Sequence, residues 1–87
     1  MKNELHYHLK DFNRVAFPGL SFPIITIYNS PLDFPGEYVA RLFDLTKATP
    51  YFCTAATLEE IRKKMPYGKT CIPRYADDPE SVVESWI

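Results

Sequence analysis

Three side chains in this 87-residue sequence have types that could do chemistry. His6 and His8 are two residues apart, so on a β-strand both imidazoles would project from one face. Their Cα atoms would then be about 7 Å apart, within reach of one metal ion. Cys53 could act as a nucleophile, because it precedes a predicted helix start, where a thiolate is favoured. A metal-binding protein or a small enzyme would use these residues.

Each of these residues lacks the partners that its chemistry needs. Structural zinc sites use cysteines or histidines paired at short spacings, and neither Cys53 nor Cys71 has such a partner in the sequence. A base for Cys53 would have to come from the distant histidines, and no third group is placed to orient it. We therefore predict no catalytic residue, no metal site and no cofactor. We expect both thiols to be free, with Cys53 a small buried apolar residue.

A basic stretch between residues 62 and 74 is the feature that suggests nucleic acid. It combines five cationic side chains with an aromatic ring for stacking, and its residues are Arg62, Lys63, Lys64, Tyr67, Lys69 and Arg74. The first three follow Glu59 and Glu60 on one predicted helix, where they complement the helix dipole. The net charge of the chain is −1, whereas nucleic-acid-binding domains are usually basic overall. Nucleic acid is therefore an alternative and not the expected partner.

The C-terminal region is acidic and contains Asp77, Asp78, Glu80 and Glu84. Paired carboxylates can perform acid–base chemistry or hold Mg²⁺. Asp78 is followed by Pro79, however, and this pair is typical of a turn or a helix cap. We therefore assign these carboxylates no catalytic or metal role.

Five strands and one helix must position these residues. β-branched and aromatic residues with apolar–polar alternation predict strands over 24–28, 37–43, 51–55, 70–74 and 82–87. Pro50 is expected in the turn before the third strand, and Pro73 confines the fourth to a sheet edge or a bulge. Residues 82–87 also fit a helical face after Asp78 and Pro79, but their β-branched and aromatic content favours a strand.

The helix is predicted over residues 58–65. Thr57 and Glu60 form a capping box, in which each side chain bonds to the backbone N–H of the other residue. Leu58, Ile61 and Met65 make one apolar stripe and should pack on strands 24–28, 37–43 and 51–55. The predicted fold is thus an α+β domain with a mostly antiparallel sheet of four to five strands and one short helix on one face.

Residues 23–87 form this single domain, and residues 1–22 are expected to be an N-terminal extension. Alternation within residues 5–10 predicts a strand with Leu5, Tyr7 and Leu9 on one face. The spacing of Leu5, Leu9 and Phe12 also fits a helical stripe. Both interpretations of the extension remain open at this point.

From residue 23 onward the sequence resembles short uncharacterised bacterial and phage-type proteins. The resemblance lies in the stretch from Ile27 to Pro31, in the capping segment 57–61, in Asp77-Asp78-Pro79 and in the 84–87 ending. It implies no activity and carries over no functional residues.

Apolar residues lie on both faces of several predicted strands. Val39 and Phe43 lie opposite Leu42, and Val82 and Trp86 lie opposite the apolar Val83 and Ile87 in the last strand. One short helix covers only one face of a sheet, and an antiparallel sheet leaves the other face open only if that face is polar. We therefore expect Val39, Phe43, Val82 and Trp86 at the interface of a two-fold homodimer, or of a complex with another protein.

Composition places the chain among globular proteins, with 46% hydrophobic and 24% charged residues. The N-terminal residues are too polar for a secretory signal, and the apolar run at 23–28 is too short to span a bilayer. We expect a cytoplasmic protein without membrane contact, in which any disulfide would be reduced. The predicted function is that of a small non-enzymatic, self-associating interaction module. The alternatives are a nucleic-acid binder using the basic stretch and an enzyme or metal-binding protein using Cys53, His6 or His8.

Overall fold

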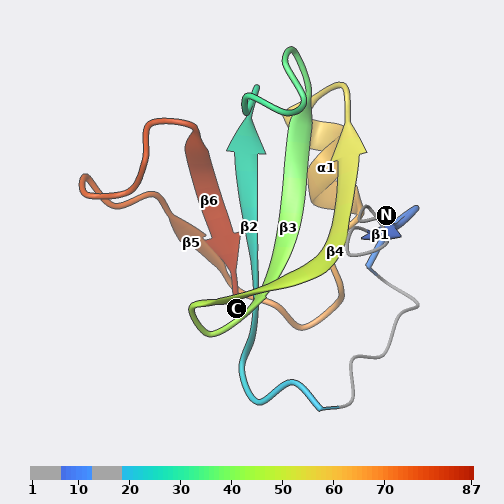
Figure 1. Ribbon diagram of the computed structural model, residues 1–87, viewed down its shortest axis with the longest axis vertical. Coiled ribbons are helices and arrows are strands. Elements are labelled where there is room, and N and C mark those ends of the chain that lie inside the picture. The colour runs from blue at the N-terminus through green and yellow to red at the C-terminus, as the bar shows by residue number, and fades with distance from the viewer. Residues whose placement is uncertain (1–6, 13–18) are drawn as a thin grey trace.

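A six-stranded sheet and one helix make up the fold in the computed structural model, which describes residues 7–12 and 19–87 (Figure 1). The elements in chain order are β1 (Tyr7–His8), β2 (Pro23–Asn29), β3 (Tyr38–Asp44), β4 (Lys47–Ala55), α1 (Leu58–Lys63), β5 (Cys71–Pro73) and β6 (Val82–Trp86). The sheet order is β1-β4-β3-β2-β6-β5. In this order the neighbouring strands β4, β3, β2, β6 and β5 are all paired antiparallel. The strand β1 pairs with β4 in parallel. The predicted α+β fold is confirmed.

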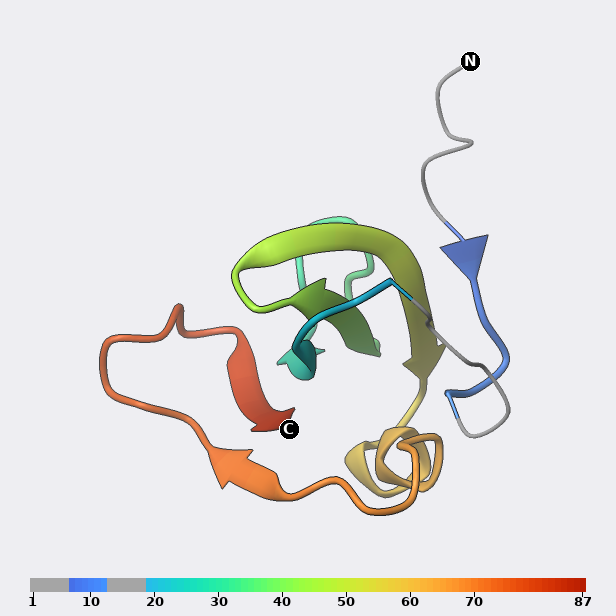
Figure 2. The ribbon, with the colours of Figure 1, turned by 90° about the horizontal axis from the view of Figure 1, so that it is seen from below.

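The sheet curls around α1, which lies on its concave side (Figure 2). Alternation along the central strands directs Ile25, Ile27, Ala40, Leu42 and Cys53 to this side. From the helical side Ile61 and Met65 complete the buried cluster, and Leu58 packs against it. Leu58 and Ile61 of the predicted apolar stripe thus lie on the helix, whereas Met65 lies beyond its end at Lys63. Among the described residues no helix is long and apolar enough to cross a membrane.

The capping box begins the helix as predicted, with one difference. The Thr57 hydroxyl accepts a hydrogen bond from the Glu60 backbone N–H at 3.1 Å. The prediction has the Glu60 carboxylate accepting from the Thr57 backbone N–H. In the structure Glu60 Oε1 accepts instead from the Thr57 hydroxyl at 3.3 Å. The helix ends at Lys63, two residues earlier than predicted, because Lys64 already serves as the C-cap.

Part of the predicted N-terminal extension packs against residues 23–87. The Leu9 N–H donates to the Phe52 carbonyl at 2.7 Å, and the Phe12 N–H donates to the Lys64 carbonyl at 2.9 Å. The Phe12 ring is only 1% exposed and joins the core cluster, with Leu9 packed against that cluster. Within the strand predicted over residues 5–10, Tyr7–His8 form a strand of two residues. Leu5 lies outside the described residues.

The connection between β3 and β4 differs from the prediction. The turn consists of residues 45–46, and Pro50 lies inside β4. Leu45 has φ 60°, a left-handed conformation that glycine or asparagine usually supplies, so the sequence lacks the usual turn signal. Pro50 is tolerated because the β3–β4 register shifts between Arg41 and Phe43. The Thr49 hydroxyl donates to the Leu42 carbonyl at 2.7 Å and supplies a donor in the stretch where the proline has none.

A β-bulge between β2 and β6 corrects the predicted faces of the last strand. Glu84 pairs with Ile27, but Val82 already pairs with Tyr28, so Val83 is the extra residue. Val82 therefore lies on the face that α1 does not cover. Trp86 lies on the covered face with Val83, and both pack against the core. The expectation that Val82 and Trp86 share a face is wrong.

Candidate interaction surface

The face of the sheet turned away from α1 contains two adjoining hollows, which together we call the β2–β6 groove. The first has a volume of about 270 Å³, and its floor is formed by Ile24, Thr26, Tyr28, Phe43, Val82 and Ser85. The second, of about 320 Å³, shares Ile24, Asp78 and Ser85 with the first and continues over Ile72 and Ile87. Within the described part of the chain no helix covers this face. An apolar surface of this kind is typical of a contact site.

Large apolar side chains project into solvent at the border of the groove. Leu45 is 58% exposed, Tyr75 is 70% exposed and Ile87 is 42% exposed. Leu45 costs free energy in two ways. Its apolar side chain is exposed to water, and its backbone has the left-handed conformation, which is unfavourable for residues with a Cβ. Strained residues of this kind occur preferentially at functional positions.

Several polar groups of the groove are hydrogen-bonded within the protein. The hydroxyls of Thr26 and Ser85 are 3.0 Å apart. Asp78 Oδ2 accepts from the Tyr75 N–H at 2.9 Å, which confirms the predicted turn role of Asp78. Burial raises the pKa of the Tyr28 phenol above its usual value, so this side chain is a neutral hydroxyl in the floor of the groove.

The part of the same face over β4 is covered by the 30–37 loop. Phe34 lies against Phe52 with ring centroids 5.3 Å apart, and Asp33 forms an ion pair with Arg41, whose guanidinium lies over the Phe52 ring. The His8 ring also stacks on the Phe52 ring, with the ring centroids 4.9 Å apart. Phe52 is buried under this cover, and Val39 on the same face is fully buried as well. The open part of the face is thus limited to the β2–β6 groove.

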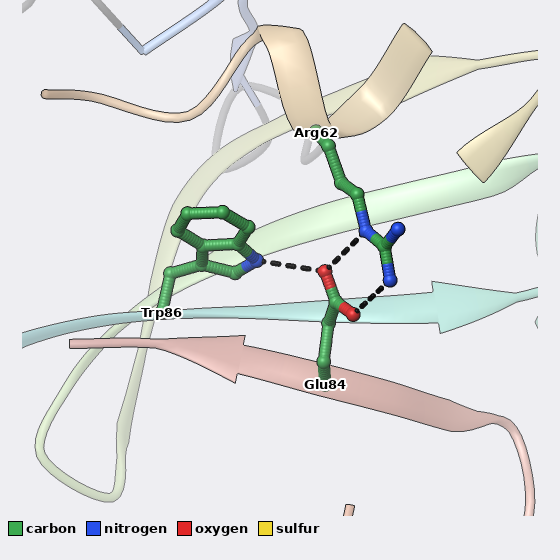
Figure 3. A network of polar contacts seen from close by, with 3 residues as sticks. All are labelled: Arg62, Glu84 and Trp86. Atoms are coloured by element: carbon green, nitrogen blue, oxygen red, sulfur yellow. Dashed lines mark hydrogen bonds and ion pairs between the residues drawn. The ribbon is translucent and has the colours of Figure 1, made fainter. Parts of the chain in front are cut away.

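The covered face holds a charged residue, Glu84, which is 4% exposed (Figure 3). Arg62 from α1 binds its carboxylate with two hydrogen bonds of 2.7 and 3.0 Å, and the Trp86 indole N–H donates to it at 3.0 Å. Hydrogen bonding by Arg62 holds the pKa of Glu84 below its ordinary value, whereas desolvation opposes this shift. The network joins the helix to β6, so its role is structural.

The residues of the predicted basic stretch are distributed around the molecule and bonded to the protein. Besides Arg62, Lys64 Nζ donates to the Lys10 carbonyl at 2.8 Å and Lys69 Nζ donates to the Pro23 carbonyl at 3.1 Å. Arg74 donates to the Asp78 carbonyl at 2.7 Å. Tyr67 is almost fully exposed, and Lys63 and Glu60 line an open hollow of about 440 Å³. Most of these cations thus have bonds within the fold.

Neither cysteine has the environment of a nucleophile. Cys53 is fully buried, and desolvation raises the pKa of its thiol to about 12. Cys71 is exposed on β5, and partial burial together with the Glu84 carboxylate raises its thiol pKa above the usual value. Both thiols are free, as predicted. The sheet order separates their strands by β3, β2 and β6, which explains why they cannot pair.

A metal site built from His8 and Cys53 is not formed. His8 Nε2 lies 3.1 Å from the Thr54 hydroxyl on the face away from α1, whereas Cys53 belongs to the core on the opposite face. His6 lies outside the described residues. Among the residues that are described, no group of three or more metal-binding side chains comes together.

The four predicted interface residues have different positions. Phe43 and Val82 contribute to the floor of the groove, whereas Val39 is fully buried and Trp86 packs against the core. Sequence reasoning missed Leu45 and Tyr75, which are more exposed than any of the four. Leu45 could have been recognised in the sequence, because an apolar residue in a two-residue turn is unusual. No feature of the sequence points to Tyr75.

The search of protein-family models, of curated proteins and of solved structures finds no match for the chain. The resemblance of residues 23–87 to short bacterial and phage-type proteins therefore stays a prediction.

Proposed function

We propose that this protein is a non-enzymatic interaction module that self-associates through the β2–β6 groove. The observation that carries the proposal is the combination of an apolar groove with exposed apolar side chains at its border, on a face that α1 leaves uncovered. Burial of such a surface against a second copy removes apolar area from water. Two-fold dimers are the commonest way for a single chain to achieve this.

The absence of poised chemistry among the described residues favours an interaction module over an enzyme. Their buried side-chain nitrogen and oxygen atoms all have hydrogen-bond partners, so none of them is left unpaired in the interior. The buried Cys53 thiol stays protonated at neutral pH because its pKa is about 12. The exposed free thiol of Cys71 fits a reducing compartment, and we propose the cytoplasm.

Light scattering coupled to gel filtration tests this proposal. At micromolar concentration we expect a mass twice that of one chain, with a fall towards the monomer mass on dilution. A monomer mass that persists at the highest attainable concentration contradicts self-association.

Nucleic-acid binding is the second candidate, and it has less support. Arg62, Lys64, Lys69 and Arg74 donate hydrogen bonds within the protein, so phosphate would have to compete for them. We expect binding to generic DNA or RNA no tighter than the non-specific range of roughly 10⁻⁴–10⁻⁶ M at physiological salt. A tighter, salt-dependent complex that Lys63→Glu together with Lys64→Glu abolishes would make nucleic acid the better function.

A further inference from the structure

The 30–37 loop is longer than the connection between β2 and β3 requires (Figure 1). The two strands are paired as far as Asn29 and Tyr38, and hairpin loops usually have about two to five residues. The additional length packs back against Phe52 of β4. Long loops that are ordered by their own contacts frequently carry a function.

The surface beneath this loop combines a cation with an aromatic ring. Arg41 and Phe52 are direct partners in the β3–β4 register, and the guanidinium carbon lies 5.7 Å from the centroid of the Phe52 ring. The His8 ring stacks on the same phenyl ring and helps to fix it. A guanidinium beside an aromatic ring can bind a carboxylate and an aromatic group that are close together in one ligand.

The loop supplies both of these groups from consecutive residues. Asp33 forms an ion pair with Arg41, and Phe34 lies against Phe52 with the ring centroids 5.3 Å apart. The Phe34 N–H donates to the Pro31 carbonyl at 3.0 Å, so a turn presents the acidic and the aromatic side chain together. The loop thus contacts this surface in the way that a bound peptide would.

The contacts between the loop and this surface are incomplete. A hollow of about 180 Å³ remains between Asp33, Phe34, Arg41 and Phe52. The Asp33 side chain is 57% exposed, and an ion pair that is open to solvent contributes little to stability. Leu32 is fully exposed and adds no apolar contact. Another chain that offers the same two groups can therefore compete with the loop.

The loop is also closed at its own base. The Ser30 N–H donates to the Glu37 carbonyl at 2.7 Å, and the Gly36 N–H donates to the Ser30 hydroxyl at 2.9 Å. None of these bonds involves the ladder between β2 and β3, which ends at Asn29 and Tyr38. Displacement of Asp33 and Phe34 therefore leaves the sheet intact.

We propose that the 30–37 loop is an internal ligand, and that Arg41 and Phe52 beneath it form a recognition site for a segment of another protein. The chemistry of that segment follows from the loop that now occupies the site: a carboxylate residue followed directly by an aromatic residue. This inference goes beyond self-association through the β2–β6 groove and does not depend on it.

A peptide-binding experiment on the full chain tests the proposal. The probe is a fluorescent peptide with the sequence of residues 30–37, in which prolines on both sides of the acidic–aromatic pair restrict the backbone. The variant Asp33→Asn together with Phe34→Ala removes the internal competitor. Because a site that is mostly occupied lowers the apparent affinity for an external ligand, this variant should bind the peptide at least about tenfold more tightly than wild type. Fluorescence anisotropy measures both dissociation constants.

Matched controls identify the groups that carry the binding. Peptides with Asp33→Asn or Phe34→Ala should bind the loop variant at least about tenfold more weakly than the parent peptide, because each lacks one of the two groups that the site recognises. Arg41→Gln added to the loop variant should abolish binding. Leu32→Ala changes the same loop at a side chain without a contact and should bind the peptide as wild type does. Circular dichroism should show that every variant keeps its fold.

The outcomes decide the proposal without reference to the oligomeric state. Equal affinity of the peptide for wild type and the loop variant, or no binding to either, contradicts an internal ligand. Equal binding of the three peptides to the loop variant contradicts recognition of an acidic–aromatic pair. Binding that survives Arg41→Gln contradicts the site. None of these results bears on self-association, which the mass measurement tests separately.

Discussion

The two faces of the sheet differ in how completely the chain covers them. The face under α1 is covered, and the buried carboxylate of Glu84 on this face is bonded by Arg62 and by the Trp86 indole. The face with the β2–β6 groove is open, and its border carries large apolar side chains that are exposed to water. On the covered face a polar group is satisfied within the chain, whereas on the open face the apolar groups lack such cover.

This difference separates stability from contact. Residues of the covered face should determine whether the chain folds, because their burial is completed by the chain itself. Residues at the border of the groove should contribute little to folding, and their effect should be measured in the association of two copies. The predictions below test this division.

The largest effect is expected at Phe12. This ring is buried in the core from the N-terminal segment, so Phe12→Ala should lower the free energy of unfolding by about 3–5 kcal/mol. Urea unfolding measures the change. The matched control is Phe43→Ala in the floor of the open groove, which should cost markedly less because Phe43 is only partly buried. Equal losses would contradict the division between the faces.

The next effect concerns the Glu84 network and depends on pH. The folded pKa of Glu84 is lowered from 4.5, first by the hydrogen bonds from Arg62. Its contribution to stability is therefore present above the unfolded pKa and is lost as pH falls through the folded pKa. Glu84→Gln should cost about 1–3 kcal/mol at neutral pH. The difference from wild type should shrink below pH 4.5 in urea titrations, and a pH-independent difference would contradict the ionic role.

A smaller effect is expected at the helix cap. Thr57→Ala removes the acceptor for the Glu60 N–H and should cost about 0.5–2 kcal/mol. Thr57→Ser keeps the hydroxyl and serves as the control with little loss. If both variants unfold at the same urea midpoint, the hydroxyl does not hold the helix that covers the core.

Local signals in the sequence were sufficient for most of the fold. The capping box placed the start of α1, β-branched residues placed β2, and Pro73 placed β5 at an edge. The bonds between Thr70 and Ile87 alternate along the β5–β6 pair, so the missing N–H of Pro73 faces outward. These features depend on neighbours in the sequence, which is why they could be predicted.

Features that depend on distant partners could not be predicted. The carboxylate of Glu84 is bonded by Arg62, 22 residues away, and the sequence alone assigned Arg62 to a possible phosphate contact. The bulge that separates Val82 from Trp86 arises from pairing with β2, and one extra residue reverses which face each side chain occupies. The position of Val82 in the floor of the groove follows from that bulge, and the position of Leu45 at its border follows from the turn.

The smallest effect on folding, and the sharpest test of the comparison, is expected at Leu45. Asparagine adopts the left-handed conformation more readily than leucine, so Leu45→Asn should leave the unfolding free energy of the monomer unchanged or raise it by up to about 1 kcal/mol. The same change removes an apolar side chain from the groove border.

Leu45→Asn should therefore weaken self-association while the monomer keeps or gains stability. Sedimentation measures the dimer dissociation constant, and urea unfolding at a dilution where the chain is monomeric measures the fold. Leu32→Asn is the control, because Leu32 is equally apolar and fully exposed but lies in the 30–37 loop away from the groove. Opposite signs for association and folding at Leu45, with neither changed at Leu32, would mean that the leucine is kept for contact. A loss of monomer stability at Leu45 would instead give the side chain a role within its own chain.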